Sequence, residues 1–181
     1  MAGNILQGYA ATTVTVTTTN LVSASAASVS LTAGWTSNTV TNNVNNYVDY
    51  AYSGQFTTTS ANRQVGYINV WVIASLNDTP TWTATSAGTL GTESATQVKF
   101  ENTASSTNQL MSIGRLLASI YTTATNGEIY TFPQTGIAQL FGGVVPTHHC
   151  LFISNSAAST TSAGFANTCA LYYQPIIGKY T

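Results

Sequence analysis

Residues 67–74 read Tyr-Ile-Asn-Val-Trp-Val-Ile-Ala, and this stretch decides the fold. Both faces that it would present as a strand are apolar, which predicts a central strand covered on both sides. Short strand-like pieces lie before and after it, separated by Gly, Asn and Pro. Such a series favours an all-β sandwich or barrel over a sheet with crossover helices. The other strands are predicted at residues 48–52, 79–84, 96–102, 128–132, 148–155 and 169–180.

One short helix is expected to interrupt the strands after residue 134. Ile137, Leu140 and Phe141 fall at helical spacing. Thr135 is the expected N-cap, because a threonine hydroxyl can accept a hydrogen bond from a free backbone N–H at the start of a helix. The two glycines at 142–143 would end the helix after one or two turns.

The segment from Leu110 to Ile120 fits two patterns, because its apolar residues are compatible with both a helical and an alternating spacing. Gly114 lies in its middle, and glycine is unfavourable inside a helix. The residues at 120–122 are Ile, Tyr and Thr, which favour strands. A strand is therefore the preferred interpretation, and a helix is the alternative.

The first part of the chain differs in composition from the rest. Residues 1–33 are rich in Thr, Ser and Ala, and they contain no charged side chain. They are too poor in apolar residues to close a core, which predicts an extended N-terminal arm over residues 1–38 and a β-sandwich domain over residues 39–181. The arm would lie on the main body or on a neighbouring subunit, and a free tail is the alternative. The candidate assembly contacts are Val14, Val16, Val22, Val29, Leu31, Tyr50 and Tyr52.

Charge is scarce throughout the chain. Lys, Arg, Asp and Glu make up 5% of the residues, against roughly 25% in typical soluble domains. The four basic residues are scattered, so no basic footprint for nucleic acid exists. The longest apolar run, Val70 to Ala74, is too short to suggest a membrane span. A nearly neutral surface gives little repulsion between molecules, which favours a chain that works in an assembly over a free monomer kept soluble by hydroxyls and amides.

No pattern of reactive residues predicts an enzyme, and no cofactor or metal is expected. The two histidines are adjacent, and in a strand His148 and His149 would point to opposite faces. His148 and Cys150 would share a face, but two ligands without further partners are better explained by packing than by zinc. Cys150 and Cys169 are expected to be free, buried thiols, with a disulfide as the alternative. The sequence has none of the nucleotide-binding or hydrolase motifs.

From residue 116 onward, ordered blocks of the sequence resemble a family of small virion proteins of tailed bacteriophages, the head decoration or cement proteins. The blocks are Leu116-Leu117-Ala118-Ser119-Ile120, Tyr130-Thr131-Phe132, Ile137-Ala138-Gln139-Leu140-Phe141-Gly142-Gly143, Val145-Pro146, Leu151-Phe152-Ile153, Asn155 and Tyr173-Gln174-Pro175-Ile176. They cover roughly the carboxy-terminal third of the chain. The chain departs from the family at residues 148–150, which are His-His-Cys where a bulky aromatic or basic stretch is expected.

The resemblance implies a jelly-roll sandwich that caps or cements the phage head lattice. It implies the major capsid protein as partner, a homo-oligomer with a trimer favoured, a place on the capsid exterior, and synthesis in the host cytoplasm. The second hypothesis is a carbohydrate- or receptor-binding module on a fibre or cell surface, in which Tyr and Trp stack on sugar rings. The aromatic residues that could form such a platform are Tyr47, Tyr50, Tyr52, Trp71, Trp82, Tyr172 and Tyr173.

Overall fold

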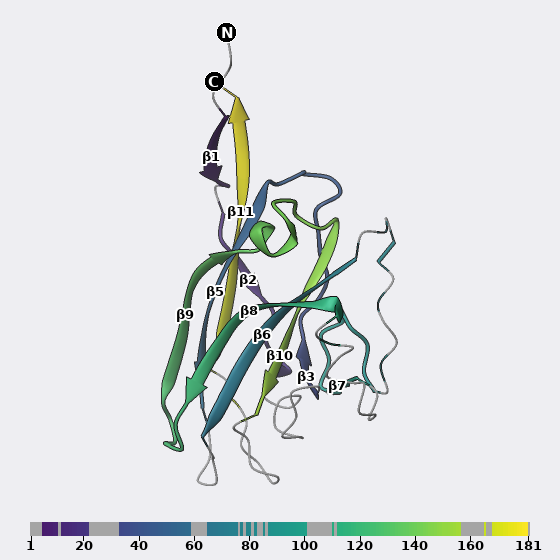
Figure 1. The fold of residues 1–181 in the computed structure, drawn as a ribbon. Coiled ribbons are helices and arrows are strands. Elements are labelled where there is room, and N and C mark those ends of the chain that lie inside the picture. Colours follow the sequence, from purple (N-terminus) through teal and green to yellow (C-terminus); the bar gives the residue numbers. More distant parts are fainter. Residues whose placement is uncertain are drawn as a thin grey trace.

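The chain folds into a β-sandwich of two antiparallel sheets with one short 3-10 turn (Figure 1). The computed structural model describes residues 5–10, 12–21, 33–58, 65–75, 77, 79–80, 82, 85, 87–100, 110, 112–156, 165 and 168–180. The first sheet contains β1 (Ile5–Tyr9), β2 (Val14–Val16), β5 (Asp49–Thr57), β9 (Ile129–Gly136) and β11 (Ala170–Tyr180). The second contains β3 (Ala33–Thr36), β4 (Val40–Thr41), β6 (Gly66–Ser75), β7 (Val98–Lys99), β8 (Gly114–Thr122) and β10 (His148–Asn155).

The two antiparallel sheets confirm the all-β sandwich that the sequence predicts. In the first sheet the order is β1-β11-β5-β9, and β2 pairs with β11 beside β1. In the second sheet the order is β7-β3-β10-β6-β8, and β4 pairs with β10 beside β3. The chain therefore crosses repeatedly from one sheet to the other, and its first strands pair with its last strand, as in double-sheet jelly rolls.

Strand β6 is the central strand that residues 67–74 predict, because it pairs with β10 on one side and β8 on the other. Ile68, Val70 and Val72 are fully buried in the main core between the sheets. Ile73 faces the opposite way, into a second apolar cluster that includes Leu90, Val98 and Phe100. Each buried side chain of this kind contributes on the order of 2 kcal/mol of hydrophobic stabilisation, which explains why both faces of this strand are apolar.

Several predicted strands are confirmed, with shifted ends. Strand β10 occupies the predicted range 148–155, β11 begins at Ala170, and β9 runs on to Gly136. Between 96 and 102 the strand is confined to Val98–Lys99. Between 79 and 84 the structure describes residues 79, 80 and 82, and none of these three lies in a strand.

The segment at 110–120 follows the strand interpretation for most of its length. Strand β8 begins at Gly114 and continues to Thr122. The described residues just before it, Leu110, Ser112 and Ile113, have helical backbone. The backbone changes from helical to extended at Gly114. A side chain would be crowded there, because a Cβ at this position would lie 2.9 Å from the carbonyl oxygen of Leu110.

The predicted helix is a 3-10 turn, η1 (Ala138–Phe141), and the prediction that Thr135 caps it is wrong. Thr135 lies in β9, and its hydroxyl donates to the carbonyl oxygen of Pro133. The cap comes from β5: Oδ1 of Asp49 accepts from the backbone N–H of Ile137 at 2.9 Å and of Ala138 at 2.8 Å. Asp49 is far from η1 in the sequence, but the pairing of β5 with β9 brings its carboxylate to the start of the turn. The carboxylate therefore takes the capping role predicted for the Thr135 hydroxyl.

Two glycines make this turn possible. Gly136 lies directly over the carboxylate of Asp49, where a Cβ would approach Oδ2 to 2.2 Å. Gly142 ends η1, as predicted, in the left-handed conformation with φ of 73°. Glycine enters that region without the steric cost that a side chain brings.

The predicted arm over residues 1–38 is divided between the two sheets. Strands β1 and β2 lie one after the other along β11 of the same chain, which corresponds to an arm lying on the main body. Strand β3 pairs with β10 and β7 inside the second sheet, and all four of its residues are buried. The sandwich thus includes part of the segment that composition assigns to the arm.

Candidate functional site

A two-stranded ribbon projects from one end of the sandwich (Figure 1). It consists of β1 and the last residues of β11, with the register running from Ile5 opposite Tyr180 to Tyr9 opposite Ile176. The pairing of β11 with β5 ends at Ile176, so from Ile177 onward β11 pairs with β1 alone within the described residues. An isolated two-stranded ribbon is marginally stable in water, and its unpaired edges are available to another chain.

Asp49 connects this ribbon to the turn η1. It pairs in register with Ile176 at the base of the ribbon, while its carboxylate caps η1. The backbone N–H of Val48 also donates to the carbonyl oxygen of Ile176 at 2.9 Å. The ribbon base and η1 therefore belong to the same end of the sandwich.

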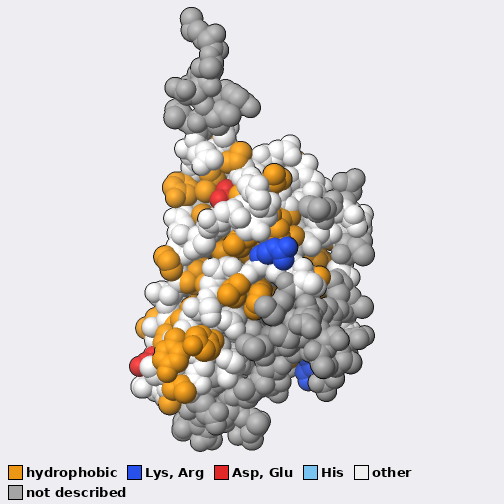
Figure 2. All heavy atoms as spheres, in the orientation of Figure 1, with side chains coloured by type: hydrophobic (Ala, Val, Ile, Leu, Met, Phe, Trp, Pro, Cys, Tyr) orange, Lys and Arg blue, Asp and Glu red, His pale blue; other side chains and the backbone are white. Residues whose placement is uncertain are grey.

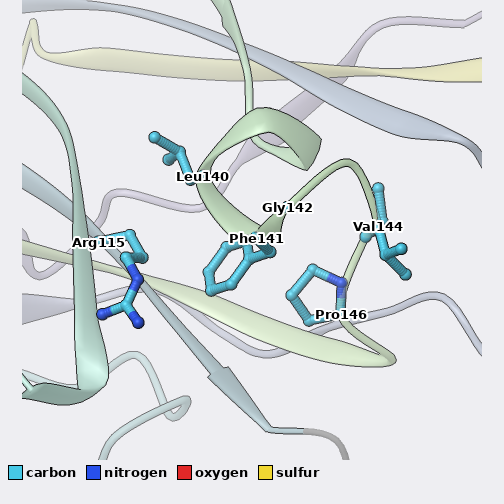
Figure 3. Close-up of a pocket in the computed structure, with 7 residues that line it drawn as sticks. Arg115, Leu140, Phe141, Gly142, Val144 and Pro146 are labelled. Carbon is cyan, nitrogen blue, oxygen red and sulfur yellow. The ribbon is translucent and has the colours of Figure 1, made fainter.

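An open groove of about 500 Å³ lies beside η1 (Figure 3). Figure 3 shows Arg115, from β8, at one end of the groove and Val144 at the other, with Phe141 and Pro146 between them. Apart from the Arg115 guanidinium and Gly142, the side chains around it are apolar: Leu140, Phe141, Val144, Val145 and Pro146. The groove is thus an apolar channel with one positive charge.

A second hollow of about 290 Å³ adjoins the first. Both hollows are lined by Val144 and Val145, and the second is completed by Gly143 and residues of the 42–48 loop, including Tyr47 and Val48. The side chain of Val144 is 70% exposed, so it stands as an apolar knob between the two hollows. We call this region, formed by residues 140–146 with Arg115, Tyr47 and Val48, the end surface.

The charge of Arg115 is not matched by any carboxylate that the structure describes. Its Nη1 donates to two backbone carbonyl oxygens, those of Ser112 at 3.4 Å and Gly114 at 3.1 Å. Asp49 caps η1, and Glu93 accepts from the backbone N–H and the side-chain amide of Asn20. Glu128 accepts from the hydroxyls of Thr123 and Tyr130. Each of the three described carboxylates is thus engaged elsewhere.

His149 is enclosed in the core and neutral. Its side chain is 0% exposed, and its Nε2 shares a hydrogen bond of 2.7 Å with the hydroxyl of Tyr52. Burial, followed by the nearby charge of His148, lowers the pKa of His149 to about 3. Burial likewise raises the pKa of Tyr52 well above its usual value. No substrate can reach this pair without opening the sandwich.

The two cysteines are free thiols, as the sequence predicts. Burial raises the pKa of Cys150 to about 12 and that of Cys169 to about 11, so both are protonated at neutral pH. Across the part of the chain that the structure describes, no three His, Cys, Asp or Glu side chains gather as they would around a metal ion. Within the same residues, no helix has the length and hydropathy of a membrane span.

The candidate assembly contacts named from the sequence are not brought together on one surface. Val16 is buried and Val14 half-buried, and both lie on β2 against β11 of the same chain. Tyr50 and Tyr52 are each 1% exposed and pack in the main core, so they are not available to a partner. Val22, Val29 and Leu31 lie outside the described residues.

Sequence reasoning missed the end surface and the projecting ribbon. The end surface did have a local signal in the sequence, Phe141-Gly-Gly-Val-Val-Pro146. In this stretch apolar residues flank two glycines, a composition typical of an exposed loop. The position of Arg115 opposite that loop depends on the pairing of β8 with β6 and has no local signal. Comparison of the chain with protein-family models, curated proteins and solved structures found no match.

Proposed function

We propose that this chain is a structural virion protein that binds the exterior of a bacteriophage head as a decoration or cement protein. The major capsid protein is the proposed partner, and the protein is proposed to self-associate, with a trimer favoured. The main support is the ribbon of β1 and the end of β11, which projects beyond the rest of the sandwich and leaves strand edges unpaired in the described residues. Unpaired edges bind other chains by adding main-chain hydrogen bonds.

The surface chemistry supports the same proposal. Figure 2 shows a face with few charged side chains, on which hydrophobic side chains gather in several groups. The end surface adds an exposed apolar knob at Val144 close to the ribbon base. Because few charges take part, binding through these surfaces should depend only weakly on salt.

The test uses the full chain and a variant that lacks residues 1–9, which removes β1. We expect the full chain to bind heads of the virus that encodes it, assembled without this protein, and the truncated chain to lose most of that binding. The matched control is Ile129→Thr, which alters an exposed apolar residue at the start of β9. Full occupancy of heads by the truncated chain would refute the role of the ribbon, and failure of the full chain to bind heads would refute the proposed function.

A second candidate function, carbohydrate or receptor binding, has one specific observation in its favour. Tyr67 on β6 and Tyr121 on β8 lie opposite each other, 49% and 58% exposed, with ring centroids 5.6 Å apart. Aromatic faces exposed in this way can stack on sugar rings. A glycan array on which the wild type binds and Tyr67→Ala does not would favour this function over the first, whereas an array without binding would count against it.

A further inference from the structure

We propose that the groove beside η1 binds a short segment of a different protein, in which one or two apolar side chains stand next to a carboxylate that pairs with Arg115. This inference deepens the proposed function, on which it rests for its biological setting, by naming the chemistry of the partner. The apolar channel would take the side chains, and the guanidinium would take the carboxylate.

The charge of Arg115 is not matched by any described carboxylate. Arg115 is exposed, lies at one end of an apolar groove, and donates to the backbone carbonyl oxygens of Ser112 and Gly114. A guanidinium presents a planar fork of donors that matches a carboxylate, and it is the side chain most suited to ion pairs at interfaces. On a chain with four basic residues in all, a cation in this position is a specific feature of the surface.

The shape of the end surface also fits an extended occupant. A volume of about 500 Å³ falls within the range of roughly 300–1,000 Å³ typical of ligand sites. The neighbouring hollow of about 290 Å³ continues the surface beyond Val144. An occupant that covers both hollows and the exposed valine between them is extended, which fits a protein segment better than a compact small molecule.

The three carboxylates that the structure describes are already hydrogen-bonded within the chain, which disfavours them as partners of Arg115 from a second copy. Asp49 is held by the backbone N–H groups of η1, and Glu93 by Asn20 and by Nε1 of Trp35 at 3.4 Å. Glu128 is held by neighbouring hydroxyls on β9 and the preceding turn. Withdrawing any of these carboxylates would leave its part-buried donors without their acceptor, which costs free energy. A partner with its own free carboxylate avoids this cost.

The test is a selection from a library of random linear twelve-residue peptides on the immobilised full chain. We expect wild type to enrich peptides that carry Asp or Glu beside aliphatic or aromatic residues. Arg115→Glu should enrich Lys or Arg instead, and it should bind the wild-type peptides about 10-fold more weakly, which corresponds to one ion pair of about 1.4 kcal/mol. Val144→Ser should weaken binding without changing the preferred charge.

Lys99→Glu is the matched control, because Lys99 is exposed and lies on β7, away from the groove. It should keep the acidic preference of wild type. Arg115→Gln, which keeps the length of the polar side chain without charge, should lose the preference without reversing it, and thermal unfolding would confirm that each variant is folded.

Three results would overturn the inference: no enriched peptide on wild type, enrichment without acidic residues, or an acidic preference that survives Arg115→Glu. The selection does not use phage heads. A failed selection therefore contradicts the groove inference alone, and a failure to bind heads contradicts the proposed function alone. Acidic peptides that depend on Arg115 would support the groove as a binding site even for a chain that does not bind heads.

Discussion

Acidification is expected to destabilise this protein through His149. In the folded chain its pKa is about 3, because the ring is buried between the sheets, whereas a histidine in an unfolded chain titrates near 6.5. Above pH 6.5 the ring is neutral in both states and contributes nothing to the pH dependence. Below pH 6.5 the unfolded chain binds a proton that the folded chain excludes, so the free energy of unfolding falls.

The size of the effect follows from these two pKa values. Each pH unit below 6.5 removes about 1.4 kcal/mol, so the loss is about 2 kcal/mol at pH 5 and approaches about 5 kcal/mol near pH 3. Domains are stable by roughly 5–15 kcal/mol in total. A loss of this size is therefore a large part of the stability and is readily measured.

The assay is urea unfolding at pH 7.5, 6 and 5, followed by tryptophan fluorescence, to which the fully buried Trp35 contributes. His149→Gln should lower the stability at pH 7.5 but remove most of the decline towards pH 5. Tyr52→Phe keeps the ring buried while deleting the 2.7 Å hydrogen bond, so it should keep the decline, since burial is the main cause of the lowered pKa. A wild-type stability that is flat from pH 7.5 to 5, or a decline that persists in His149→Gln, would refute this reasoning.

Other expectations concern the η1 cap and the thiols. Asp49→Ala should lower the free energy of unfolding by about 1–2 kcal/mol, because two backbone N–H groups lose their acceptor; an unchanged urea midpoint would contradict the capping role. Gly136→Ala should cost about 1–3 kcal/mol, because its Cβ would meet the Asp49 carboxylate, and Gly8→Ala on β1, with nothing within 4 Å of the added Cβ, is the comparison for urea unfolding. Cys150 and Cys169 should resist an aromatic disulfide reagent at pH 7.5 until urea is added, since both are buried protonated thiols; rapid reaction of the folded protein would show that they are accessible.

The strands that the sequence predicted well are those with a strong local pattern. Residues 148–155 alternate between the two cores, with Leu151 and Ile153 in the main cluster and Cys150 and Phe152 in the second. That alternation is a property of any extended chain, so it is readable without a structure. The pattern at 96–102 is weaker, and the strand there is limited to Val98–Lys99, because β7 pairs with β3 at only two positions.

The candidate contacts were harder to place, because exposure depends on what covers a side chain. Tyr50 and Tyr52 have the aromatic character of interface residues, yet the second sheet covers them, and His149 meets the hydroxyl of Tyr52. Val144 has no unusual neighbours in the sequence, but the loop after η1 leaves it exposed. Composition alone therefore identified apolar residues without showing which of them face solvent.

By itself, the sequence determined the all-β character, the double-sided burial of the central strand, the scarcity of charge and the end of the short turn at Gly142, because each depends on residues close together in the chain. The tertiary structure alone decided that Asp49 caps η1 in place of Thr135, that β1 and β11 form a projecting ribbon, and that Arg115 meets an apolar groove. These features join residues far apart in sequence. Their positions depend on which strands pair and in what register, and no local preference specifies that pairing.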